Sequence, residues 1–329
     1  MLENSPVSQK VLEYFNSKYG QMIAPVGLFK LLSCISPFVN EFLPCFNVFT
    51  VAPTRQFKSK TSYEVQEMIP KKYFIDLPSD ITMNALLSEY KDFNRKCLFI
   101  NDCTTLFATK SRRTKERLIS GLTNLLSEGC WGYGDKTTRV ETLKGFVSMV
   151  VNLTIESYNK YEKTLLGSTL LERFLTIFYI MPEAEIKHFI ENKEEKLKIK
   201  WKGKIKFLSN LEVKNLKDYK TTLIDYAKRW SVLSLKSING CYDMISSMVK
   251  SHLALNQREY IKEDELDVLK MTEQYLVNPF SPNQSRIIEF YKQGRSWKDI
   301  CLLLGKEPEK YKTYVFKVLR KARERGVIS

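Results

Sequence analysis

The feature that most limits how this chain can fold is a short apolar run, Phe46 to Val51, followed by a loop and then by Lys60-Thr61. A β-branched run of this length is typical of a buried strand, and Ala52-Pro53 opens a turn after it. Ser62 to Met68 can then continue as a helix. Strand, loop and Lys-Thr at a helix start is the order of a phosphate-binding loop, in which backbone N–H groups and the Lys hold phosphates and the hydroxyl reaches Mg²⁺.

The usual pattern of such a loop is G-x-x-x-x-G-K-[ST]. Counting back from Lys60 places Thr54 and Ser59 where the two glycines belong. Glycine is used there because the loop needs positive φ and close backbone approach, so the two replacements weaken the prediction of nucleotide binding. The alternative is a solvated Lys60 on an ordinary capped helix, and this motif alone favours that alternative.

Two further buried strands are expected at Lys96–Ile100 and Phe146–Val151, and polar residues follow each of them. Asn101 and Asp102 come after the first strand, and Asn152 after the second. Because the carboxyl ends of parallel strands meet at one edge of a sheet, these side chains and the phosphate-binding loop are expected to gather there. Asp102 would then orient water or hold Mg²⁺. The alternative is that it only caps the segment after its strand.

Composition favours a soluble protein with a polyanionic partner. A length of 329 residues suggests two domains at about 150 residues each. The net charge of +15 favours nucleic acid ahead of a membrane, although a generally Lys-rich protein is the alternative. Seven cysteines without a C-x-x-C pair, and two histidines, argue against a zinc site or a disulfide framework and favour the reducing cytoplasm. We expect no membrane span, because no apolar run reaches about 18 residues.

Two segments of the first 210 residues suit contact with nucleic acid. A glycine-rich stretch sets aromatic side chains, which can stack on bases, beside basic ones: Trp131, Tyr133, Lys136, Arg139 and Lys144. The alternative is that these aromatics pack beneath the loop. From Lys196 to Phe207, lysines alternate with apolar residues, which predicts a hairpin with one basic face. That face suits phosphate groups or, equally, protects an edge strand from aggregation.

The C-terminal segment has the layout of a helix-turn-helix. After Pro279 and Pro282, helices are expected at Arg286–Gln293, Trp297–Leu304 and Glu309–Arg325, with turns at Gly294 and Gly305. The third helix is the candidate DNA reader, and its basic residues are Lys310, Lys312, Lys317, Arg320, Lys321 and Arg323. A merely solvated charged helix is the alternative, but layout and charge agree here.

The order of these motifs resembles the core of AAA+ ATPases. Strand-loop-Lys60-Thr61, strand-Asn101-Asp102, strand-Asn152 and then Leu170-Leu-Glu-Arg-Phe174 come closest to the branch that holds minichromosome-maintenance helicases and magnesium-chelatase-like proteins. The resemblance implies ATP and Mg²⁺ as cofactors. It assigns the phosphates to Thr54, Ser59, Lys60 and Thr61, and the metal to Thr61, Asn101 and Asp102, with Asp102 also acting on water.

Three further roles follow from the resemblance. Asn152 would be the γ-phosphate sensor. Arg173 would be a finger that reaches a neighbouring subunit's nucleotide and stabilises transition-state charge there, or else would form a local ion pair. Lys236 stands where the family has the Arg of a second sensor, and it offers a point charge without the planar fork.

The predicted fold class is α/β, with a parallel-sheet, AAA+-like P-loop core, a helical lid and a C-terminal helix-turn-helix or winged-helix domain. The expected divisions are a helical lead-in at 1–43, the core at 44–185, a basic insertion and lid at 186–277, and the DNA-binding domain at 278–329. The expected function is an ATP-dependent DNA motor, a helicase or replication-initiation ATPase of a plasmid or virus, working as a homo-oligomeric ring or filament. The alternatives are a DNA-binding regulator or scaffold on an inactive core and, more weakly, a basic RNA-binding protein.

Overall fold

The structure, a computed structural model, describes residues 5–39, 44–81, 92–105, 112–131, 143–166, 170–181, 186, 205–234, 236–276 and 282–324. The chain divides into two compact units, Met1–Leu276 and Val277–Ser329. No helix in the described ranges is long and apolar enough to cross a membrane.

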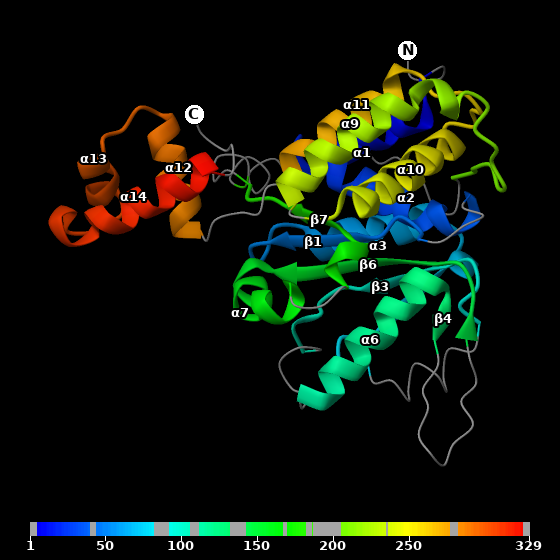
Figure 1. The fold of residues 1–329 in the computed structure, drawn as a ribbon, viewed down its shortest axis with the longest axis horizontal. Coiled ribbons are helices and arrows are strands. Elements are labelled where there is room, and N and C mark those ends of the chain that lie inside the picture. The colour runs from blue at the N-terminus through cyan, green and yellow to red at the C-terminus, as the bar shows by residue number, and fades with distance from the viewer. Residues whose placement is uncertain are drawn as a thin grey trace. The chain divides into compact units, whose positions relative to one another are not determined.

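A five-stranded, all-parallel sheet forms the centre of the first unit (Figure 1). In spatial order its strands are β2 (Phe74–Leu77), β3 (Lys96–Ile100), β6 (Val147–Thr154), β1 (Val48–Ala52) and β7 (Leu175–Phe178). In the register of the sheet, Thr50 of β1 lies between Asn152 of β6 and Ile177 of β7. The predicted α/β class with buried parallel strands is thus confirmed, and the sheet is compatible with a P-loop-like or Rossmann-like core.

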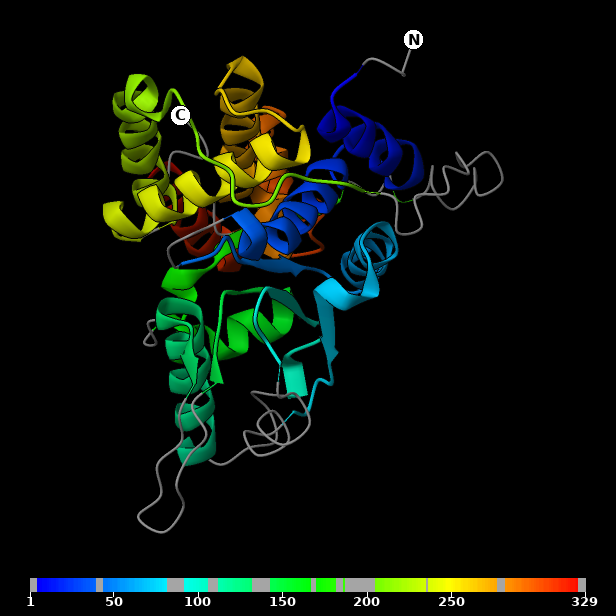
Figure 2. The same cartoon turned by 90° about the vertical axis from the view of Figure 1, so that its right-hand side faces the viewer.

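Helices cover both faces of this sheet (Figures 1 and 2). On one face pack α1 (Val7–Tyr19), α2 (Ala24–Val39), α3 (Lys58–Met68), α9 (Leu216–Ser234), α10 (Ile238–Leu255) and α11 (Glu263–Leu276). On the other lie α6 (Arg112–Glu128) and α7 (Ile155–Leu166). Successive strand residues alternate between the two cores, as Val48 and Phe49 of β1 do, because side chains of a strand point to opposite faces in turn.

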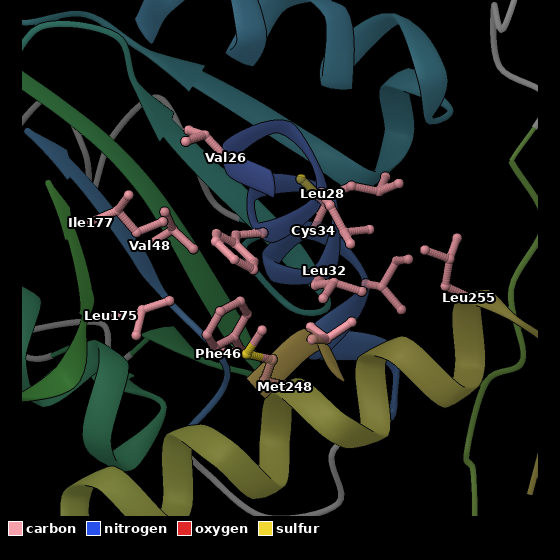
Figure 3. Close-up of a cluster of buried hydrophobic side chains, with 14 of the residues drawn as sticks. Val26, Leu28, Leu32, Cys34, Phe46, Val48, Leu175, Ile177, Met248 and Leu255 are labelled. Atoms are coloured by element: carbon pink, nitrogen blue, oxygen red, sulfur yellow. The ribbon is translucent and has the colours of Figure 1, made fainter. Parts of the chain in front are cut away.

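Helix α2 is buried along its whole length. All of its residues are buried, including Pro37 within its last turn. Figure 3 shows its side chains together with those of β1 and β7, meeting Met248 and Leu255 of α10. Gly27 lets α1 and α2 approach closely, since a Cβ there would lie 2.4 Å from the ring of Phe15. This packing holds α2 directly against the sheet.

A two-stranded antiparallel ribbon extends from the first unit. It consists of β4 (Cys130–Trp131) and β5 (Leu143–Lys144). Outside the described residues lie those between these two strands, residues 82–91, and the part of the expected lysine-rich hairpin that precedes Ile205.

The described part of the second unit contains three helices, α12 (Pro282–Lys292), α13 (Trp297–Leu303) and α14 (Pro308–Glu324). Their apolar sides form a separate core that includes Ile287, Ile300 and Val315. Gly294 and Gly305 make the connecting turns with φ of +77° and +64°, a conformation that favours glycine. Ser296 and Asp299 form a reciprocal capping box at the start of α13. The winged-helix domain stays a prediction, because residues 325–329 are not among those described.

Candidate phosphate-binding site

The loop between β1 and α3 has the backbone conformation that glycine usually supplies. β1 ends at Ala52 and α3 begins at Lys58, so the loop leaves the carboxyl end of an interior strand and enters a helix N-terminus. Arg55 and Phe57 have φ of 64° and 60°, in the left-handed region that side chains with a Cβ seldom adopt. The position and the shape both match a phosphate-binding loop.

Lys58 folds back over this loop. Its Nζ donates hydrogen bonds to the carbonyl oxygens of Ala52 at 2.7 Å and Pro53 at 2.6 Å. Burial lowers the pKa of Lys58 to about 8, while the charges of Glu156 and Asp102 act in the opposite direction. The first turn of α3 holds no acidic residue, and its leading N–H groups have no acceptors within the helix. A bound anion would therefore stabilise the charged form of the Lys58 amine and would interact favourably with the positive end of the helix dipole.

The structure places Lys58-Ser59, rather than Lys60-Thr61, at the start of α3. In this register Ala52 and Phe57 stand at the glycine positions of G-x-x-x-x-G-K-[ST]. Lys60 is exposed, with its Nζ 5.7 Å from the ring centroid of Phe57, and the predicted loop residue Thr54 is also exposed. The Lys-Ser pair was the signal for this register, and the absence of both glycines hid it.

Thr61 lies on the buried face of α3 rather than at the loop. It is fully buried, its hydroxyl donates to the carbonyl oxygen of Lys58 at 2.8 Å, and its Oγ1 accepts from Lys30 Nζ at 2.9 Å. Ser59 instead reaches the residue that follows β3, since its hydroxyl donates to the Asn101 carbonyl oxygen at 3.2 Å. Ser59 is therefore better placed than Thr61 to reach a metal ion bound beside phosphate.

Lys30 of α2 is a functional candidate that the sequence analysis missed. Its amine is fully buried and contacts the Lys58 carbonyl oxygen, Thr61 Oγ1 and Ser62 Oγ at 2.7, 2.9 and 3.0 Å, and Asn152 Oδ1 at 2.9 Å. Burial lowers its pKa well below the usual value, and the nearby charge of Lys58 lowers it further. A single lysine inside an otherwise apolar helix was the available signal.

The side chain of Asn152 is buried and forms hydrogen bonds within the protein. It is 1% exposed; its Oδ1 accepts from Lys30, and its Nδ2 donates to Ser62 Oγ at 3.0 Å and to Asn101 Oδ1 at 3.3 Å. Asn101 in turn donates from Nδ2 to Asp76 Oδ1 at 3.1 Å. A polar chain thus crosses the carboxyl ends of β2, β3 and β6. The predicted sensor is present at the expected edge, but its hydrogen-bonding capacity is already engaged.

Asp102 is exposed, and its carboxylate accepts from the backbone N–H of Thr104 at 2.9 Å. This is the capping role given above as the alternative. Within the described ranges, no group of three or more His, Cys, Asp or Glu side chains forms a metal site. Mg²⁺ usually takes one or two carboxylates together with phosphate oxygens and water, so Ser59, Asn101 and Asp102 fit a metal that arrives with a nucleotide.

Arg173 and Lys236 lie at the opposite end of the sheet. Arg173 ends the short helix η2 (Leu171–Arg173), just before β7, and its buried Nε has no hydrogen-bond partner in the described part of the chain. Lys236 donates from Nζ to the Phe174 carbonyl oxygen, and contacts Thr176 Oγ1 at 3.5 Å. Burial lowers the pKa of Lys236 to about 8. Because strand starts and strand ends lie at opposite edges of a parallel sheet, neither residue belongs to this chain's own loop.

Most of the described residues that were predicted to contact nucleic acid lie on α14. Its buried side consists of Val315, Val318, Leu319 and Ala322, whereas Lys310, Lys312, Lys317, Arg320 and Arg323 are exposed. Lys310 pairs with Glu307 at 2.7 Å, and Lys312 Nζ lies 4.9 Å from the Trp297 ring centroid. Lys136 and Arg139 fall outside the described residues, and the side chains of Lys144 and Lys321 are not described.

No known protein-family model matches the sequence. No curated protein matches it either. The likeness to AAA+ ATPases therefore rests on motif order alone and remains a prediction.

Proposed function

We propose that this chain is a DNA-binding regulator or scaffold, built on an AAA+-like core that holds the phosphates of ATP at the loop before α3. The exposed basic face of α14 is the observation that carries the DNA-binding part. Its other face is occupied by the core of the second unit, so the charged face is available to a partner. A basic helix after a short turn suits the phosphate backbone and fits the major groove.

The nucleotide part is supported by Lys58 and the N-terminus of α3. Phosphate oxygens would replace the Ala52 and Pro53 carbonyls as partners of the Lys58 amine and would also accept from the first N–H groups of the helix. Mg²⁺, when bound with the nucleotide, neutralises charge on the phosphates. Ser59, Asn101 and Asp102 are the residues that we assign to it.

The hydrogen bonds around this site favour binding over fast hydrolysis. Asn152 and Thr61 are engaged by Lys30, and Asp102 holds the backbone of Thr104. Each would have to break an existing contact before acting on phosphate, metal or water. The described cysteines other than Cys130 are buried thiols that form no disulfide, which fits a reducing compartment such as the cytoplasm.

The motor is the second candidate, and Arg173 is the observation that favours it. Its Nε is buried without a partner in the described residues, and it lies at the sheet end opposite the loop. In a homo-oligomeric ring or filament, that position suits contact with a neighbour's nucleotide.

The test measures duplex DNA binding and ATP turnover in the same preparation. Lys317→Glu on α14 should weaken duplex binding. It should also reduce the slope of log affinity against log salt concentration by about one, the loss of one phosphate contact. Lys220→Glu, an equal charge change at an exposed position of α9, is the control. A scaffold should bind DNA equally with and without ATP and should turn ATP over very slowly.

Other outcomes separate the candidates. DNA-stimulated turnover that is lost in Lys58→Ala and in Arg173→Ala would establish the motor instead. Equal losses of duplex binding in Lys317→Glu and Lys220→Glu would contradict the assignment to α14. Tighter binding of RNA than of duplex DNA at matched salt would favour the RNA-binding alternative.

A further inference from the structure

A cleft of about 770 Å³ opens in the first unit near the amino end of β3. Its walls come from the end of α2, the short helix η1 (Lys71–Tyr73), the turn before β3, and the segment that begins at Ile205. The strands run parallel, so this cleft belongs to the edge of the sheet away from the loop that precedes α3.

Three aromatic rings form one wall of the cleft. The ring centroids of Phe38 and Tyr73 are 4.6 Å apart, those of Phe38 and Phe207 are 5.2 Å apart, and those of Tyr73 and Phe207 are 5.8 Å apart. Phe38 is buried beneath the other two, which are only half-buried. The inner ring therefore fixes two outer rings that still present surface to a ligand.

The other described side chains that line the cleft are basic or neutral. Arg95 is held in place because its Nη1 donates to the Phe38 carbonyl oxygen at 3.1 Å and its backbone N–H donates to the Phe146 carbonyl oxygen at 2.8 Å. Lys206 is exposed beside Phe207, whereas Ile205 is buried. This continues the alternation of lysine and apolar residues seen in the preceding sequence. Among the described residues that line the cleft, none is Asp or Glu.

We propose that this cleft binds a nucleotide unit of single-stranded nucleic acid. Phe207 and Tyr73 would stack on the base, and Lys206 and Arg95 would contact the adjoining phosphate. Aromatic platforms beside cations are the features by which proteins hold single strands, because every base has a π-face and every linkage carries a charge. Duplex DNA keeps its bases stacked and would not offer them to this wall. The proposal is separate from the triphosphate at α3 and from duplex DNA on α14.

The experiment measures fluorescence anisotropy of a labelled oligothymidylate of about ten nucleotides, within the span that one such groove covers. Phe207→Leu keeps an apolar side chain but removes the ring, and Lys206→Glu changes an exposed charge, so neither should prevent folding. Each should weaken binding about tenfold, a loss within the range known for one stacked base or one charged contact. Lys220→Glu on α9 is the charge-matched control and should bind like the wild type.

Further measurements distinguish single-stranded nucleic acid from a free nucleotide and from duplex DNA as the ligand of this cleft. Thymidine monophosphate should compete only weakly, because it offers one base and one phosphate; competition equal to that of the strand would overturn the assignment to a strand. Duplex DNA should bind Lys206→Glu and the wild type alike, whereas Lys317→Glu should lose duplex binding only. The proposal fails if Phe207→Leu binds the strand normally, or if Lys220→Glu loses as much affinity as Lys206→Glu.

Discussion

Lys30 Nζ donates to Asn152 Oδ1 over 2.9 Å, and this bond joins a helix on one face of the sheet to the polar end of β6. The same amine reaches the carbonyl oxygen of Lys58, the first residue of α3. One buried side chain thus ties α2, α3 and β6 together beside the loop that precedes α3. Among the described residues, neither Asp nor Glu accepts a hydrogen bond from this amine, and its four acceptors are uncharged oxygens.

Lys30→Met should destabilise the first unit. Methionine keeps most of the side-chain volume but leaves Asn152 Oδ1 without the amine, and an unsatisfied buried polar group costs about 1–3 kcal/mol. We expect the free energy of unfolding to fall by about 2 kcal/mol in urea denaturation. Lys220→Met, at an exposed position, should change it by less than about 0.5 kcal/mol.

The pH dependence of the difference in unfolding free energy between the wild type and Lys30→Met provides an independent check. Burial lowers the pKa of Lys30 below its unfolded value of 10.5, so between the two values the unfolded chain binds more protons. The stability that the wild type owes to Lys30 therefore rises with pH over this range. Lys30→Met lacks this contribution, so the stability gap should widen as pH rises towards 10.5. A gap that stays constant or narrows would contradict a buried amine.

Nucleotide affinity should fall as pH rises above about 8, the pKa of Lys58 in the free protein. A bound phosphate favours the charged amine and so raises this pKa, which means that binding takes up a proton above pH 8. Linkage then predicts a loss of roughly tenfold per pH unit. Calorimetry of ATP binding in buffers of different ionisation enthalpy measures both the affinity and the proton uptake.

Lys58→Arg is the matched variant, because a guanidinium stays charged across this range. It should bind ATP with little pH dependence, whereas Lys60→Arg should behave like the wild type. If Lys60→Arg abolishes the pH dependence and Lys58→Arg does not, the register that starts α3 with Lys58 is not the functional one.

The sequence predicted the strands well because each is a continuous apolar run. Lys96–Ile100 was expected with the bounds that β3 has, whereas β6 continues past the expected Phe146–Val151 as far as Thr154. The helices of the second unit also followed from local signals, since Gly294 and Gly305 separate them. The bounds of α9 within the lid were not predicted, because its apolar positions are spread among many charged ones.

The site was harder to predict because its defining contacts join distant parts of the chain. Lys30 and Asn152 are 122 residues apart, and nothing in a helix of apolar residues indicates what one lysine will meet. The loop register was hidden for a local reason, since Phe57 takes a glycine conformation without being glycine. Motif order predicted that Asn101, Asp102 and Asn152 would lie near one edge of the sheet, but only packing shows which side chains are already engaged there.

Glu64→Gln should loosen the attachment of α1 to α3. The Glu64 carboxylate accepts from Tyr14 Oη, Lys18 Nζ and Tyr19 Oη. Burial raises its pKa, but the hydrogen bonds from Lys18 and Tyr14 and the charge of Lys18 outweigh burial, so the pKa lies below 4.5. Losing the charge should lower the free energy of unfolding by about 1–2 kcal/mol.

The same substitution should change the acid side of the stability profile. A carboxyl whose folded pKa is lowered contributes stability that is present above 4.5 and is lost as pH falls through the folded value. The gap between the wild type and Glu64→Gln should therefore close in acid. Urea denaturation at a series of pH values measures it, and a gap that persists well below pH 4 would mean that the charge of Glu64 is not its source.

Arg173 allows the motor candidate to be tested by mixing two inactive variants. It lies at the amino end of β7, whereas Lys58 follows the carboxyl end of β1, so a shared site would take Lys58 from one subunit and Arg173 from the next. If the wild type turns over ATP, Lys58→Ala and Arg173→Ala should each be inactive alone. Some interfaces of a mixed oligomer then unite an intact Lys58 with an intact Arg173, and turnover should return in the mixture.

Arg173→Lys is the conservative control, because it keeps the charge without the planar fork. Activity of Arg173→Ala alone, or a mixture that stays inactive although mass measurement shows mixed oligomers, would exclude a role for Arg173 in a neighbour's site.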